Sequence, residues 1–325
     1  MDLYMAGSTF NGLNEWMQDM GYNKLLSYLN DKPAIKAWQD YIDKTGKTKS
    51  KLFIDSGAFT AWTKGAQIDV DEYINWLNER KDFITLFGQV DKIPGDIKTG
   101  ATSKQVKEAA EETWQNYLYM RERVINKDGL LYTFHVGEPY KYLEQALEWK
   151  DENGNHIKYI ALGGMVGKPS NVKIGFLNKC FEIISNSNNP NVQVHTFGMT
   201  SLNLLTSYPI TSADSTGWIM TAVTGSVFSP YGNICLSVET QTNNTKEVKN
   251  NLVDIEVTNA KNFINLPKYK QDLLLEYINK TGFKLKELQN DYRQREKFNI
   301  KYLQEWSERN FYEKPKVKPG ILINI

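Results

Sequence analysis

Short apolar runs of strand length alternate along the chain with longer amphipathic or polar segments of helix length. The runs are rich in β-branched and aromatic residues, which favour extended backbone. We expect strands at residues 2–8, 51–58, 84–91, 130–137, 159–164, 192–199, 210–215 and 233–238. Regular alternation of this kind predicts a parallel sheet with helical crossovers.

Four of the intervening segments carry helix start signals. They are Asp69 before residues 70–80, Ser103 before 104–124, Glu138-Pro139 before 140–149 and Ser170 before 171–185. Eight strand–helix units closing on themselves favour an α/β fold of the (β/α)8 TIM-barrel type over an open doubly wound sheet. The dinucleotide fingerprint Gly-x-Gly-x-x-Gly is missing after the first strand, where AGSTFNG stands instead.

The pattern changes after the last expected strand. We expect residues 1–240 to form the TIM-barrel catalytic domain and residues 241–325 to form a loop followed by a basic helical C-terminal extension. Helical periodicity returns at 268–280 and at 283–310. Residues 261–325 hold 14 Lys and Arg against 8 Asp and Glu, although the whole chain carries only +1. A charged partner would therefore have to bind a local cluster of charged residues.

Composition places the chain among ordinary globular proteins. It has 325 residues, 41% hydrophobic and 24% charged, and a mean hydropathy of −0.51. No apolar run approaches the length of a membrane span, and the two cysteines are too few for a disulfide framework or a CxxC-type zinc site. These features predict a cytoplasmic protein with no membrane partner.

Polar and ionisable residues gather at the C-terminal ends of the expected strands, where the βα loops of a barrel converge. They are Asp55, Ser56, Asp91, His135, His195 and Asp214, and the same strand ends also carry Gly163, Gly164 and Met199. One such residue alone is usually a helix cap or a satisfied buried group. Several ionisable groups on one rim are costly unless they serve a purpose, so the set predicts an active site.

The residue types restrict the chemistry of this site. His135, His195 and Asp214 invite a metal, but neither H-x-H in the first strand nor H-E-x-x-H occurs, so we expect no metal and no other cofactor. Ser56 and Ser215 lie outside any G-x-S-x-G nucleophile motif. The carboxylate pair that remains is the best-supported chemistry.

That pair is Asp55 and Asp214. Two carboxylates across a site suit a retaining reaction at a glycosidic bond, in which one attacks the anomeric carbon and the other handles the leaving group's proton. Phe59 on one wall and Phe197 or Met199 on the other are candidates to sandwich a planar ring, although aromatic side chains at such positions also serve as core.

Four motifs then resemble a known family. They are DSGAF (55–59), GGMVG (163–167), HTFGM (195–199) and SADSTGW (212–218). Together they resemble the tRNA-guanine transglycosylases, pentosyltransferases of TIM-barrel fold, and more closely the related deazapurine-in-DNA transglycosylases of phage and bacterial DNA modification. The resemblance covers about residues 1–240 in the right order.

The resemblance assigns roles to individual residues. It implies that Asp55 is the general acid and base and that Asp214 is the nucleophile. It implies that Phe59 stacks on the base and that Asp91 reads the purine edge. Base contacts through the backbone are implied for the double-glycine turn, which comprises Gly163, Gly164 and Met165.

Two departures from the tRNA-acting members bear on the substrate. Those members carry a C-terminal Cys/His zinc site, for which this chain lacks the cysteines, so DNA is favoured over tRNA. Lys168 stands where the tRNA-acting enzymes end the double-glycine motif with Glu, and we count it among the nucleic-acid contacts. The second substrate implied is a free deazapurine base.

The basic extension offers further contacts. Arg293, Arg295 and Arg309 are interleaved with Tyr292, Tyr302 and Trp306. This pattern suits phosphate contacts with stacking on flipped-out or single-stranded bases. It equally suits a solvated amphipathic face packed on the barrel.

Three functions follow. The first is a base-exchange transferase that replaces a purine in DNA by a 7-deazapurine such as a 7-deazaguanine. The alternative is a DNA glycosylase that uses the same carboxylates with water as acceptor. The third is an inactive barrel that only binds nucleic acid, and the retention of Asp55 and Asp214 counts against it.

Overall fold

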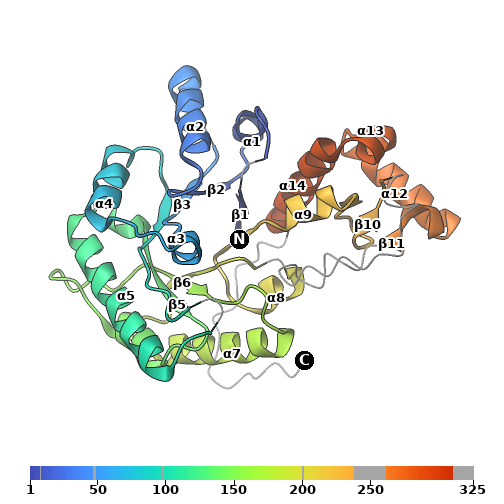
Figure 1. Cartoon of the computed structure of the whole chain (residues 1–325). Coiled ribbons are helices and arrows are strands. Elements are labelled where there is room, and N and C mark those ends of the chain that lie inside the picture. The colour runs from blue at the N-terminus through green and yellow to red at the C-terminus, as the bar shows by residue number, and fades with distance from the viewer. Residues whose placement is uncertain (8, 47–48, 97–98, 200, 238–260, 310–325) are drawn as a thin grey trace. The chain divides into compact units, whose positions relative to one another are not determined.

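The computed structural model describes residues 1–7, 9–46, 49–96, 99–199, 201–237 and 261–309. Eight parallel strands close into a barrel in chain order (Figure 1). They are β1 (Asp2–Ala6), β2 (Lys24–Ser27), β3 (Leu52–Asp55), β4 (Leu86–Gly88), β5 (Leu130–His135), β6 (Tyr159–Gly163), β7 (Gln193–Thr196) and β8 (Ser212–Ser215). The predicted (β/α)8 barrel is confirmed.

One member of the predicted strand set is wrong. The second barrel strand is β2, which the sequence pattern missed because its four residues, Lys-Leu-Leu-Ser, contain no β-branched or aromatic side chain. The segment 233–238, expected as the eighth strand, instead contributes β10 (Ile234–Cys235) to a separate three-stranded sheet with β9 (Ser226–Val227) and β11 (Lys261–Asn262). Its buried apolar run is typical of a strand but does not specify which sheet the strand joins.

Helices alternate with the barrel strands. They are α1 (Leu13–Met20), α2 (Lys32–Thr45), α3 (Ala58–Lys64), α4 (Val70–Glu79), α5 (Ser103–Arg123), α6 (Lys141–Glu148), α7 (Ser170–Asn186) and α8 (Leu202–Ser207). Asp69 caps α4 as predicted, by accepting from the Glu72 N–H at 2.9 Å. Helix α5 is capped by Thr102 rather than Ser103, because Thr102 forms a reciprocal capping box with Gln105. Within the described ranges, no helix is long and apolar enough to cross a membrane.

Inward-facing side chains fill the barrel. The cluster consists of Tyr4, Ala6, Leu25, Phe53, Leu86, Leu131, Tyr159 and Ala161, with Phe197 packed against it. Phe53 is fully buried and meets Tyr4 edge to face at 5.6 Å between ring centroids. Truncating such a ring to Ala costs about 3–5 kcal/mol, so this layer is a rigid floor beneath the strand ends.

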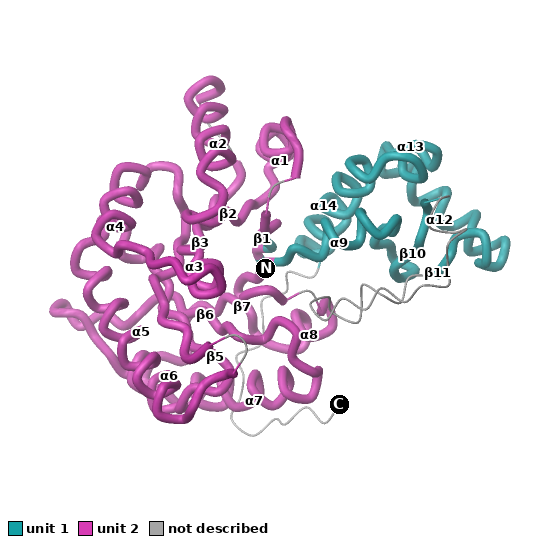
Figure 2. The backbone as a smooth tube through the Cα atoms, in the orientation of Figure 1, with its two compact units in different colours: residues 1, 3, 215–311 teal, residues 2, 4–214, 312–325 magenta. Residues whose placement is uncertain are grey.

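The chain divides into two compact units (Figure 2). One holds residue 2 and residues 4–214, and the other holds residues 1 and 3 and, as far as described, residues 215–309. The second unit contains α9 (Gly217–Val223), the small sheet, α12 (Lys268–Lys280), α13 (Leu285–Asn290) and α14 (Tyr292–Arg309). The predicted boundary between 240 and 241 lies outside the described residues.

The helices of the second unit have their own core, which includes Leu274, Ile278, Leu288 and Phe298. The single helix expected over 283–310 is broken at Asp291, whose backbone is extended. The Asp291 carboxylate accepts from the Arg293 N–H at 2.8 Å, so it ends α13 and begins α14.

Candidate active site

Four of the predicted site residues occupy the inward face of the barrel at the C-terminal ends of their strands. Asp55 ends β3, His135 ends β5, Gly163 ends β6, and Asp214 lies one residue before the end of β8. Side chains alternate along a strand, so Asp55 shares its inward face with Phe53, two residues earlier. His135 pairs directly with Gly163 across β5 and β6. The structure therefore brings these residues together on one rim.

The turn after Asp55 fixes its carboxylate. Oδ2 accepts from the Gly57 N–H at 3.0 Å. Gly57 has a φ of +85°, and a Cβ there would lie 2.7 Å from Cβ of Leu29, so a side chain is excluded. Ser56 is fully buried, and its Oγ accepts from the Ala58 N–H at 3.4 Å. Ser56 therefore supports the turn rather than facing a substrate.

The proton affinity of Asp55 is strongly perturbed. Burial, followed by the charges of Asp91 and Asp214, raises its pKa from 3.8 to about 7, and the Gly57 N–H opposes this rise. Desolvation and like charge both disfavour a carboxylate, which accounts for the direction. At neutral pH the group is thus about half protonated, the condition in which one residue gives and takes a proton with comparable ease.

Asp214 is held by two partners at the same oxygen. Its Oδ1 accepts from the Gly198 N–H at 2.9 Å and contacts Nε2 of His195 at 3.2 Å. The residue is 7% exposed. Gly198 has a φ of +62°, and a Cβ there would come within 2.4 Å of Cγ2 of Val166, so this turn also requires glycine.

His195 lies in the barrel core rather than at a substrate surface. It has no exposed area, and its ring lies 4.7 Å from the rings of both Phe53 and Phe197. Nδ1 contacts Oγ of Ser212 at 2.7 Å, and that Oγ contacts the Tyr159 hydroxyl at 2.7 Å. The predicted substrate contact is therefore replaced by a buried polar chain that ends at Asp214.

A second polar cluster joins two carboxylates through one imidazole. His135 Nε2 lies 3.0 Å from Oδ2 of Asp91, and Nδ1 lies 3.0 Å from Oε1 of Glu138. Burial lowers the pKa of His135, but the hydrogen bonds and charges of Asp91 and Glu138 outweigh it and raise the pKa to about 10. At neutral pH the ring is an imidazolium that fixes Asp91 in place.

Sequence reasoning named Glu138 only as part of a helix start. The signal that identifies it is its spacing, because the turn His-Val-Gly-Glu returns Oε2 of Glu138 to the backbone N–H of His135 at 3.2 Å. With a side chain only 4% exposed, Glu138 requires a cationic or hydrogen-bonding partner, and His135 supplies both.

The double-glycine turn packs against this cluster. A Cβ at Gly163 would lie 2.8 Å from Cδ2 of His135, and the Gly163 carbonyl accepts from the Val136 N–H at 3.1 Å. Gly164 has a φ of +73°. Met165 is 1% exposed, so a base would meet this turn through backbone groups, as the resemblance implies.

Phe59 and Met199, two of the three residues expected to sandwich a ring, differ in exposure. Phe59 on α3 is 62% exposed, with its ring 5.8 Å from that of Trp62, and is available for stacking. Met199 is 2% exposed and contributes to packing instead.

The residues expected to contact nucleic acid also differ in exposure. Lys168 is exposed in the turn before α7, and Arg293 and Arg309 are exposed on α14. Arg295 was expected among them and is a correction: it is 6% exposed and donates to the carbonyls of Ala222 and Leu288, both at 2.7 Å. Its guanidinium is used to join helices of the second unit and is not available to a phosphate.

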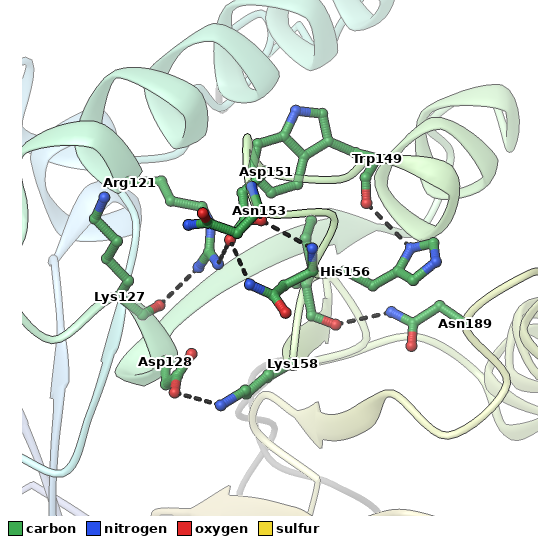
Figure 3. A network of polar contacts seen from close by, with 11 residues as sticks. Arg121, Lys127, Asp128, Trp149, Asp151, Asn153, His156, Lys158 and Asn189 are labelled. Atoms are coloured by element: carbon green, nitrogen blue, oxygen red, sulfur yellow. Dashed lines mark hydrogen bonds and ion pairs between the residues drawn. The ribbon is translucent and has the colours of Figure 1, made fainter.

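The opposite rim of the barrel carries a different network (Figure 3). Arg121 donates to the Lys127 carbonyl at 2.8 Å and lies 3.8 Å from Asp151, while Lys158 pairs with Asp128. These residues flank the N-terminal ends of β5 and β6. Joining the strand entries in this way serves stability, since chemistry in barrels occurs at the other end.

His156 belongs to that network and contacts the Trp149 carbonyl through Nδ1 at 3.1 Å. In the described part of the chain, no three His, Cys, Asp or Glu side chains are arranged to hold a metal ion.

In comparisons with known proteins, no family model matches the sequence and no curated protein matches it significantly.

Proposed function

We propose that this chain is a base-exchange glycosyltransferase that replaces a purine in DNA by a free 7-deazapurine. The observation that carries the proposal is the pair of differently held carboxylates on one rim. Asp214 is anchored through a single oxygen by Gly198 and His195, whereas the pKa of Asp55 is raised to about 7. A fixed carboxylate beside a carboxyl that exchanges protons near neutral pH suits displacement at a glycosidic carbon.

The proposed reaction has two displacements. The target nucleotide is flipped out of the duplex, because a stacked and paired base does not expose its sugar carbon to attack. Asp214 attacks C1′ and forms a sugar ester while the protonated Asp55 gives its proton to the departing purine. The incoming base then loses a proton to Asp55, attacks C1′ and releases Asp214. Two inversions retain the configuration of the sugar.

The remaining rim residues suit recognition of a planar base. The proposal assigns Asp91 to the purine edge, since His135, itself held by Glu138 at its other nitrogen, keeps the Asp91 carboxylate in one orientation. Phe59 stacks on the ring, and the double-glycine turn of Gly163 and Gly164 offers backbone groups without side chains in the way.

DNA is proposed over tRNA because the chain lacks the cysteines of the zinc site that the resemblance associates with tRNA. Lys168, Arg293 and Arg309 are proposed phosphate contacts on account of their exposure. The proposed reaction needs no cofactor and takes place in the cytoplasm.

The experiment supplies the full chain with end-labelled duplex DNA, with and without free 7-deazaguanine as the probe base. The proposal predicts that more than one equivalent of the original purine is lost per protein molecule only when the free base is present, and that no abasic sites form. Abasic sites formed without added base would instead establish the alternative, a DNA glycosylase. That alternative draws on the partial exposure of Asp55, since hydrolysis requires that water reach this carboxyl group.

A further inference from the structure

We infer that His195 is a positioning residue for Asp214: backed by Ser212 and Tyr159, it donates its Nε2 proton to Oδ1 and leaves Oδ2 as the oxygen that attacks the sugar. The part of this inference that concerns attack on the sugar rests on the proposed function. The tautomer of His195 and the direction of the hydrogen bonds from Tyr159 to Asp214 do not rest on it, and they are measurable without any substrate.

The chain of contacts runs through three strands. The Tyr159 hydroxyl of β6 lies 2.7 Å from Oγ of Ser212 in β8, and that Oγ lies 2.7 Å from Nδ1 of His195 in β7. His195 Nε2 then lies 3.2 Å from Oδ1 of Asp214. Ser212 and His195 have no exposed area, so water does not substitute for either of them.

The carboxylate of Asp214 ends this series of hydrogen bonds and sets their direction. An ionised carboxylate only accepts, so Nε2 of His195 must carry a proton toward Asp214. A neutral imidazole then presents a lone pair at Nδ1, which Ser212 satisfies by donating its hydroxyl proton. Ser212 in turn accepts from Tyr159. Every donor in this arrangement faces an acceptor, with no second charge placed in the core.

The same geometry separates the two oxygens of Asp214. Oδ1 accepts from both His195 and the Gly198 N–H, whereas no described residue donates to Oδ2. A hydrogen-bonded oxygen is the weaker nucleophile because the donors stabilise its charge. Holding Oδ1 from two directions also fixes the plane of the carboxylate, which is the orientation that a near-attack geometry needs.

The first measurement is nitrogen NMR of the full chain labelled in its histidine rings. The chain has three histidines, so the His195→Phe variant assigns the signal by its loss. At pH 7 the inference predicts a protonated Nε2 and a bare Nδ1 at His195. A protonated Nδ1, alone or together with Nε2, overturns it, because Ser212 would then accept rather than donate. This result does not depend on whether the protein turns over DNA.

The second measurement is the rate of covalent adduct formation per folded molecule. His195→Phe keeps a planar ring among Phe53 and Phe197 but removes the N–H, and we expect adduct formation to slow about 10–100-fold with DNA binding unchanged. Ser212→Ala should slow it about 3–10-fold and weaken the tautomer preference, since only one neutral hydrogen bond is lost.

Thr196→Val is the matched control. Thr196 is a neighbour of His195 in β7, has no exposed area, and carries a hydroxyl with no hydrogen-bond partner among the described residues. Its replacement deletes a buried hydroxyl outside the chain, so the adduct rate and the His195 signals should stay as in the parent. Rates within twofold of the parent in both His195→Phe and Ser212→Ala would overturn the positioning role.

Discussion

The two rims of the barrel hold the same kinds of ionisable residue in opposite ways. At the N-terminal ends of the strands, the N–H of Asn155 and further donors lower the pKa of Asp151, so its charge is stabilised by the fold. At the C-terminal ends, burial and the charges of Asp91 and Asp214 raise the pKa of Asp55, so the fold disfavours its ionised form. One rim holds its carboxylate as a structural anion, and the other keeps a carboxyl ready to exchange a proton.

The histidines repeat the contrast. His156 contacts a backbone carbonyl in a network that ties strand entries together, whereas His135 lies between the carboxylates of Asp91 and Glu138. The burial and like charge at Asp55 must be offset by stability elsewhere, which a packed core and the N-terminal network provide. The charges and burial of the two rims thus differ in the sense that the proposed function requires.

The largest effect is expected at Asp214. Asp214→Asn should abolish the covalent protein–DNA species, because an amide does not attack the sugar carbon. Denaturing gels of quenched reactions measure the adduct. The matched control is Asp151→Asn on the other rim, which should leave adduct yield per folded molecule unchanged. Equal loss of adduct in both variants would remove the functional distinction between the rims.

The next effect is at Asp55. Asp55→Asn should slow adduct formation by about 10²–10⁴-fold, the range typical of a lost general acid. Because the pKa of Asp55 is raised to about 7, adduct formation in the parent should fall above that pH, when the proton is gone, and capture of the incoming base should fall below it. Single-turnover rates from pH 5 to 9 test both limbs, and a flat profile for both steps contradicts the assignment.

Stability should respond in opposite senses at the two rims. The pKa of Asp55 is raised from 3.8 to about 7, so the folded protein holds the proton more tightly than the unfolded chain and loses stability as pH rises between those values. Asp55→Asn escapes this loss and should gain about 1–3 kcal/mol of unfolding free energy over the parent at pH 8, and little at pH 4.

The pKa of Asp151 is lowered, so its contribution is present at neutral pH and is lost as pH falls through the folded value. Asp151→Asn should therefore destabilise the protein at pH 7. Urea unfolding of both variants across this pH range gives the measurement. A loss of stability at pH 8 in Asp55→Asn would contradict the contrast.

The smallest expected effect is in the second unit. Replacing the exposed Arg293 and Arg309 by Gln should weaken DNA binding for every sequence and reduce the slope of log Kd against log salt by about 2, since each lost phosphate contact removes about one released counterion. Arg295→Gln, in contrast, should lower the melting temperature, because the Ala222 and Leu288 carbonyls lose their donor. Unchanged salt slopes would assign Arg293 and Arg309 a solubilising role only.

The sequence predicts the barrel because its hydrophobic periodicity alternates between that of strands and that of helices. The same periodicity predicts where most of the strands end. It does not reveal β2, whose leucines favour helix as much as strand and whose Lys24 is nevertheless fully buried. Nor does it separate 233–238 from the barrel, because a buried apolar run does not specify its partner strands.

The site was predictable to the same degree. Asp55 and Asp214 follow from their places at strand ends, but the roles of their neighbours depend on three-dimensional contacts. Glu138 matters only because a turn returns it to His135, and Arg295 is removed from the surface by packing that helical periodicity does not record. A pattern gives the face of a strand or helix, whereas a hydrogen-bond partner requires the fold.

The most direct test of the central claim is to locate the covalent bond. The full chain would be incubated with a short DNA duplex without free base, quenched in acid, digested, and the DNA-linked peptide sequenced by mass spectrometry. The account predicts a nucleotide sugar attached to Asp214, in a species that is lost in Asp214→Asn. Attachment to any other residue, or base exchange that proceeds with no covalent species, would contradict it.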